Sequence, residues 1–248
     1  MGNGSSGKTT SVGKGQVIDI GNENTGGGEW LNLEDLKNDS RGDIQKLFVE
    51  QTGFSSIKGT DEMDTAVLGA YGNQLNALER RFGAIGASNT AVAMVDDASF
   101  IAAVSYNPAD PSTQTLILNN KAMGSIGKSA STQRKGEAQG WHMPTDGSIK
   151  SVANYTVTHE YGHILHNQLY SKAVQNGYKG SRNQWIGSVA RSIANNATSK
   201  YGGSQKSLST YGATNAREFF AEAFANSQLG APNAVGKAMN DWLKGQGF

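Results

Sequence analysis

Two histidines and a glutamate stand at the spacing of a metal site in His159-Glu160-Tyr161-Gly162-His163. Residues four apart lie one turn apart on the same face of an α-helix, so both imidazole rings can reach a single ion. Glu160 would project beside the metal, where its carboxylate can take a proton from a water molecule. Chance would produce this pattern on the order of 0.003 times in a chain of this composition. We therefore expect a zinc site on a helix.

A pair of acids further along the chain, Glu218 and Glu222, is spaced to complete such a site. Catalytic zinc has three protein ligands and one open position. Two acids one turn apart on a helix of Phe and Ala are costly to bury without partners. One acid would bind the metal, and the other would accept the ring N–H of a ligating histidine. Two alternatives stay open: Asn215 and Glu218 also fit a capping box, and Glu222 also fits a solvated helix face.

The other two histidines are weaker candidates. His166 continues the face of the first two, but it lies about 4.5 Å beyond His163 along the helix axis, so a straight helix cannot bring all three rings to one ion. We interpret His166 as either a support for a ligand or an exposed residue. His142 is isolated in an expected loop, where a structural or solvent-exposed role is favoured over contact with a substrate.

The HEYGH motif and the later run that starts at Tyr211 (YGATNAREFFAEAF) resemble the gluzincin metallopeptidases, and most of all the catalytic domain of anthrax lethal factor and its relatives. The shared pattern is a tyrosine, six residues and then a glutamate within an E-F/Y-x-A-E-x-F run. The resemblance covers roughly residues 90–228, and similar domains occur attached to phage head proteins and mobile elements. It implies a zincin-like metallopeptidase fold. It also implies the zinc ligands His159, His163 and Glu218, the general base Glu160, the oxyanion donor Tyr211 and the ligand support Glu222.

A phosphate-loop pattern also occurs, from Gly2 to Thr9 with Lys8 in the lysine position. That motif works only after a buried strand and before a helix, because the helix N-terminus and the loop amides bind the phosphates. Only Met1 precedes the pattern, and two glycines follow it without an apolar period. We therefore expect no nucleotide binding and interpret residues 1–29, with nine glycines, as a flexible tail.

The spacing of apolar residues along the chain predicts the helices and strands that must position the site. We expect an α+β protein with one zincin-like domain over residues 30–248: a helical part (30–89), a small sheet and loop (90–149) and a helical metal-binding part (150–248). Short helical pieces are expected near residues 31–36 and 44–48, and a longer helix over 61–82, with Asp61 as N-cap and Gly83 as C-cap.

Short β-like runs at residues 90–95, 99–106 and 114–119 predict a small, mostly antiparallel meander over the HExxH helix. Residues 120–149 are expected to form a loop, and helices are expected over 151–174, 183–199, 215–227 and 232–244. The edge of the sheet, either 99–106 or 114–119, would lie along the cleft, where an extended substrate could add as a strand.

The composition excludes several classes of protein. Of 248 residues none is cysteine, so neither disulfides nor thiolate metal ligands are available, and the net charge of +1 gives no nucleic-acid footprint. No apolar run reaches the 18 residues of a membrane span and no signal peptide is recognisable. We expect a cytoplasmic or virion-associated protein, or one exported by a non-classical route.

These observations favour a zinc-dependent metalloendopeptidase whose partner is a peptide or protein substrate, with neither nucleic acid nor membrane as a partner. The alternative is a structural or binding module of the same fold in a phage virion or another assembly, without relevant proteolysis. In that alternative the N-terminal tail would contact the neighbouring proteins.

Overall fold

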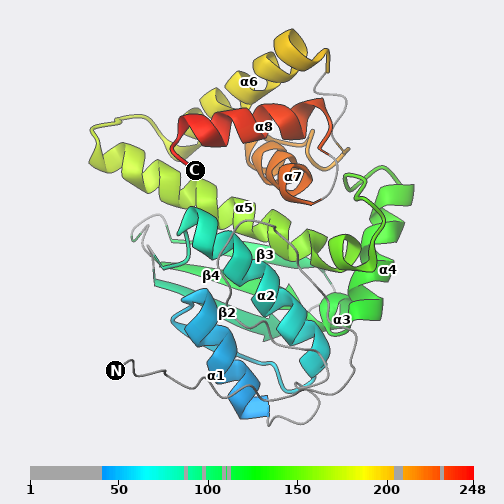
Figure 1. Cartoon of the computed structure of the whole chain (residues 1–248). Helices are drawn as coiled ribbons and strands as arrows, with labels where there is room; N and C mark the ends of the chain where they lie inside the picture. The colour runs from blue at the N-terminus through cyan, green and yellow to red at the C-terminus, as the bar shows by residue number, and fades with distance from the viewer. Residues whose placement is uncertain are drawn as a thin grey trace, which may run out of the picture.

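The computed structural model describes residues 41–86, 89–96, 99–107, 110, 113–203, 209–229 and 232–248. The glycine-rich tail, the phosphate-loop pattern and the helical piece expected near residues 31–36 lie outside these ranges. The described chain is α+β, with eight helices and a four-stranded mixed sheet (Figure 1). The helices are α1 (Arg41–Thr52), α2 (Thr65–Phe82), α3 (Asn120–Met123), α4 (Ile126–Ala138), α5 (Ile149–Gln175), α6 (Arg182–Tyr201), α7 (Ala216–Gln228) and α8 (Ala234–Gly245). The strands are β1 (Ser56–Lys58), β2 (Asn89–Val95), β3 (Ala102–Tyr106) and β4 (Thr113–Asn119).

The strand order β1-β2-β4-β3 corrects the expected antiparallel meander. β2 pairs in parallel with both β1 and β4, and only β3 and β4 are antiparallel. The chain therefore passes from β2 over the position of β4 to form β3 at the edge, and then turns back to form β4 between β2 and β3. The three residues of β1 are too few to show a period in the sequence, which is why this strand was not predicted.

The position of each strand follows from what it can bury. β2 and β4 alternate buried and half-buried residues along matched seven-residue registers, which aligns Val92 with Leu116 and Met94 with Leu118. β3 is only partly buried and takes the outer place. Of the two candidates for the edge, the segment 99–106 is therefore confirmed and the segment 114–119 is wrong, since β4 lies inside the sheet.

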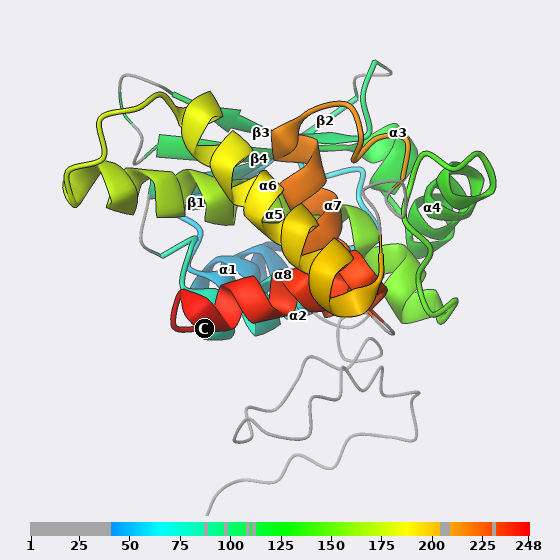
Figure 2. The same ribbon diagram turned by 90° about the horizontal axis from the view of Figure 1, so that it is seen from above.

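Helices α1 and α2 cover one face of this sheet, and α5 lies between the sheet and helices α6–α8 (Figures 1 and 2). α2 ends at Gly83, which adopts the left-handed conformation with φ 61° and confirms the predicted C-cap. The helix begins later than expected, because Asp64 rather than Asp61 is the N-cap residue. None of the described helices is both long and apolar enough to cross a membrane.

Residues 126–138 form helix α4, where a loop was expected. Ser125 caps this helix by accepting the Lys128 amide. The buried side of α4 consists of small or polar residues, Ser129, Ala130, Gln133 and Gly136, so the sequence shows no hydrophobic period there. The helix forms one wall beside α5.

The long helix α5 and helix α7 approach each other closely at Gly162. A Cβ atom at this position would lie 3.0 Å from the Cα of Ala221 and 3.3 Å from side-chain atoms of Phe224. Any larger residue would push the two helices apart. Glycine inside the HExxH motif therefore permits the spacing at which α5 and α7 can share a site.

Candidate metal centre

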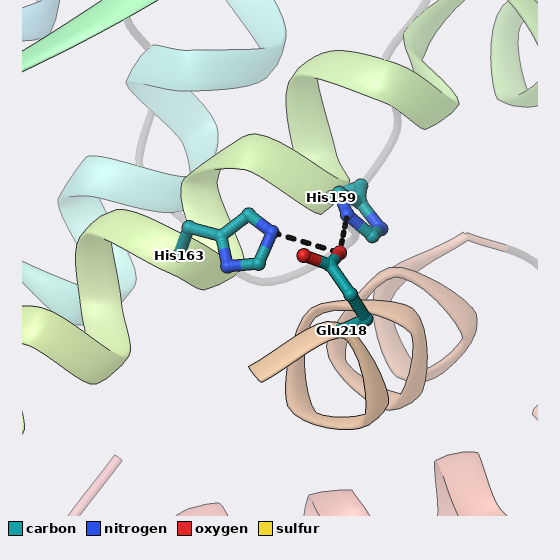
Figure 3. Close-up of side chains that lie close together, drawn as sticks. All are labelled: His159, His163 and Glu218. Atoms are coloured by element: carbon teal, nitrogen blue, oxygen red, sulfur yellow. Dashed lines mark hydrogen bonds and ion pairs between the residues drawn. The ribbon is translucent and has the colours of Figure 1, made fainter. Parts of the chain in front are cut away.

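The two histidines of α5 and one acid of α7 converge on a single point (Figure 3). The Glu218 Oε2 atom lies 3.2 Å from His159 Nε2 and 3.2 Å from His163 Nε2. One ligand atom from each of the three residues lies within 4.8 Å of the others. Two ligands of a tetrahedral zinc, each 2.0–2.1 Å from the ion, stand about 3.3 Å apart. The donor types and the two histidine–glutamate separations are therefore compatible with a zinc site.

Side-chain caps begin the two helices that carry these residues. Ser148 caps α5, and Asn215 caps α7 by accepting the amides of Arg217 and Glu218. The Glu218 carboxylate itself faces the histidines. Asn215 thus performs the capping, and the Glu218 side chain remains available to the site.

Glu222 is buried completely, one turn after Glu218, so the alternative of a solvated helix face is wrong. Its Oε1 atom lies 3.2 Å from His159 Nδ1. Its Oε2 atom accepts hydrogen bonds from the Ser209 hydroxyl at 2.7 Å and the Met143 amide at 3.2 Å. Glu222 meets His159 on the side of the ring opposite Glu218, which is the place of a residue that orients a ligand.

His163 has a partner of a different kind. Its Nδ1 atom lies 3.2 Å from His166 Nε2, and the His166 ring is buried against Phe220. The exposed alternative for His166 is therefore wrong, and the supporting one agrees with its position. Burial, the neighbouring His163 and two arginines lower the pKa of His166 well below its usual value. A neutral His166 can accept the Nδ1 proton of His163, which leaves the His163 Nε2 lone pair directed at the site.

The charges of the site are strongly coupled. Burial alone would lower the pKa of His159, but Glu218 and Glu222 on its two sides raise it to about 10. Burial would raise the pKa of Glu218, but the two histidines hold it far below its usual range. In the metal-free protein, the positive charge of the protonated histidine therefore offsets the negative charge of the two carboxylates, as a bound cation would.

Glu160 and Tyr211 face the same region. Glu160 is 5% exposed, and burial raises its pKa. Its Oε2 atom has no hydrogen-bond partner among the described residues, so this oxygen remains available for a proton. The Tyr211 ring lies 5.8 Å from that of His159 and is 39% exposed. Its pKa is raised by burial and by the surrounding carboxylates, so the hydroxyl keeps its proton as a hydrogen-bond donor.

A cleft of about 690 Å³ opens onto these residues. Its lining includes His159, Glu160 and Tyr211, the segment 99–102 at the start of β3, and α4. His142 also lines the cleft. Its ring stacks on Tyr155 at 5.6 Å, so this histidine contacts both the protein interior and the space above the site.

The sequence did not reveal the residues that support Glu222. Ser209 and the Met143 amide come from loops, and Tyr155 is one turn before His159 on α5. Ser209 also accepts the Gly212 amide at 3.0 Å, which connects the turn of Tyr211 to Glu222. Only Tyr155 carried a signal, since it lies four residues before His159 on the same helix face.

Comparison of the chain with models of protein families, with curated proteins and with solved structures finds no match.

Proposed function

We propose that the protein is a zinc-dependent metalloendopeptidase of the gluzincin type, with a zincin-like fold. The observation that carries the proposal is the convergence of His159, His163 and Glu218 within 4.8 Å, beside a buried glutamate, Glu160, that lines a cleft together with His159. His159, His163 and Glu218 would hold the ion. A bound Zn²⁺ lowers the pKa of its water and polarises the carbonyl of the substrate.

The side chains around this point divide the remaining work. Glu160 takes the proton of the attacking water, for which its raised pKa and its free Oε2 atom are suited. Tyr211 donates a hydrogen bond from its hydroxyl to the oxygen on which negative charge develops. Glu222 and His166 hold the two ligating rings in the tautomer that presents Nε2.

The sheet offers a place for the peptide main chain. β3 is the outer strand beside α5, and the segment 99–102 lines the cleft. An extended substrate could pair with this free edge and bring a peptide bond over the site.

Metal analysis and turnover test the proposal. The wild type should bind one zinc per chain, and His163→Ala should lose it. Glu160→Gln should keep zinc and the fold but lose turnover by orders of magnitude, because it removes a base and leaves the ligands intact. Equal zinc in wild type and His163→Ala would overturn the metal site. Zinc binding without cleavage of any peptide would instead favour a structural module.

A further inference from the structure

One wall of the cleft carries two lysines that are free to bind an anion. Lys121 on α3 and Lys135 on α4 both line the cleft and are exposed. Neither forms a salt bridge with a described residue, whereas Lys46 and Lys200 each have an acidic partner. The one acid of α4, Glu137, accepts hydrogen bonds from Gln133 and from the amide and hydroxyl of Thr145. These hydrogen bonds leave the Glu137 carboxylate charged, but Glu137 does not line the cleft, so the charges that this wall presents to the cleft are the two lysines.

His142 adds a polar group of defined orientation to this wall. The Gln133 amide donates to the Met143 carbonyl, so its oxygen is the atom 2.7 Å from His142 Nδ1 and must accept from it. The proton of a neutral His142 is thereby held on Nδ1. Gly136 allows this packing, because a Cβ atom there would lie 2.2 Å from His142 Nδ1.

Two exposed aromatic rings flank the same space. Trp141 is 46% exposed and Tyr211 is 39% exposed, and both line the cleft. Of the two carboxylates in the lining, Glu222 is completely buried beside His159, and Glu160 lies at the metal end. Toward α4, the cleft thus combines apolar surface with uncompensated positive charge.

We propose that this cleft selects peptides with an aspartate or glutamate close to the scissile bond, held between Lys121 and Lys135. This inference rests on the proposed peptidase function and names its class of substrate. The main chain would follow β3, and the acidic side chain would point toward α4, away from Glu160. An exposed lysine–carboxylate pair contributes about 0.2–1 kcal/mol, so two of them should favour an acidic peptide over its amide analogue by about 2- to 30-fold in kcat/KM at low salt. The preference should shrink as salt rises, because charges are screened over about 10 Å at 0.1 M.

The test uses the zinc-loaded full chain and quenched fluorescent peptides. Matched peptides carry Glu, Gln or Lys at each position around the cleaved bond, and kcat/KM is measured at low and high salt. The variants are Lys121→Glu and Lys135→Glu. Arg134→Glu is the control, since it makes the same charge change on α4 at a residue that does not line the cleft. Thermal melting confirms that each variant is folded.

We expect the wild type and Arg134→Glu to prefer the Glu peptide, and the two lysine variants to lose or reverse this preference. Equal cleavage of Glu and Gln peptides, or a preference that survives both lysine changes, would overturn the inference while leaving the peptidase function intact. Binding of labelled Glu and Gln peptides to Glu160→Gln, measured by anisotropy, gives a readout without turnover. Tighter binding of the Glu peptide that disappears in Lys135→Glu supports the inference even if no cleavage is found, and equal binding refutes it.

Discussion

Replacing Glu222 with glutamine changes the hydrogen-bonding pattern beneath the candidate metal centre without changing the side-chain volume. The carboxylate of Glu222 faces only donors: His159 Nδ1 at 3.2 Å, the Ser209 hydroxyl at 2.7 Å and the Met143 amide at 3.2 Å. A glutamine replaces one of the two carboxylate oxygens with an NH₂ group, so this donor must face one of the donors that surround Glu222. If the NH₂ group faces His159, the ring keeps its proton on Nε2, the nitrogen that would bind the proposed metal ion. If it faces the other side, the buried Met143 amide loses its charged acceptor and keeps only the Tyr155 hydroxyl, at 3.1 Å.

The magnitudes follow from these two outcomes. Loss of the partner that orients a ligating histidine costs about 10- to 100-fold in metal affinity, which equals about 1.4–2.8 kcal/mol. Loss of a hydrogen bond to a charged acceptor lowers the free energy of unfolding by about 1.5–3 kcal/mol. Glu218→Ala removes one of three ligands, so it should abolish tight zinc binding altogether.

The assay is competition with a chromophoric chelator near neutral pH, together with urea unfolding of the metal-free proteins. Glu79→Gln is the matched control, because the half-buried Glu79 carboxylate also accepts hydrogen bonds from an amide and a hydroxyl, those of Ile85 and Tyr161. It should reduce stability and leave zinc affinity unchanged. If Glu222→Gln binds zinc as the wild type does, its role is structural alone. If Glu222→Ala loses zinc while Glu218→Ala keeps it, the proposed assignment is wrong, and the ligand is Glu222, one helical turn after Glu218.

Three further predictions concern turnover, helix spacing and pH. Tyr211→Phe should retain zinc and lose about 10²–10³ in kcat, measured beside zinc content, and normal turnover would exclude the hydroxyl as the oxyanion donor. Gly162→Ala should lower the free energy of unfolding by about 1–3 kcal/mol. It should also weaken zinc binding, because the added methyl group would push α7, and with it Glu218, away from the histidines of α5. The control is Gly187→Ala, whose Cβ would meet only a flexible Arg191 atom at 3.6 Å. In the metal-free folded protein the pKa of His159 is raised to about 10, whereas in the unfolded chain it is about 6.5. Protonated His159 therefore stabilises the fold fully below about pH 6.5, and this stabilisation is lost as the pH rises through about 10. The free energy of unfolding should fall by up to about 1.4 kcal/mol per pH unit between these values. Zinc binding near pH 8 should accordingly release about one proton, which calorimetry in buffers of different ionisation enthalpy detects; no release would contradict the protonated state of His159.

The parts of the fold that the sequence predicts are those with a periodic apolar side. The predicted helix over 151–174 is observed as Ile149–Gln175, because apolar residues repeat at helical spacing along it. The order of strands was not predictable in this way. Short turns suggested neighbouring antiparallel strands, but β4 is more deeply buried than β3 and lies between β2 and β3. Helix α4 was missed because its buried side is polar.

The same distinction holds at the site. His159, His163, Glu218 and Glu222 are each one turn from a partner on their own helix, so helix geometry alone predicts which of them share a face. The loop residues Ser209 and Met143 reach Glu222 only through tertiary packing, and no local pattern announces them. The burial of His166 likewise depends on Phe220 of another helix.

The free edge of β3 also bears on how the protein behaves when it is concentrated. An outer strand can pair with the same strand of another copy, and the opposite edge of the sheet, β1, has only three residues to offer. Because the segment 99–102 at the start of β3 lines the cleft, a second chain paired with β3 would lie beside the cleft. The proposed peptidase activity per chain should then fall as the protein concentration rises, and a peptide that occupies the cleft should dissociate the pair.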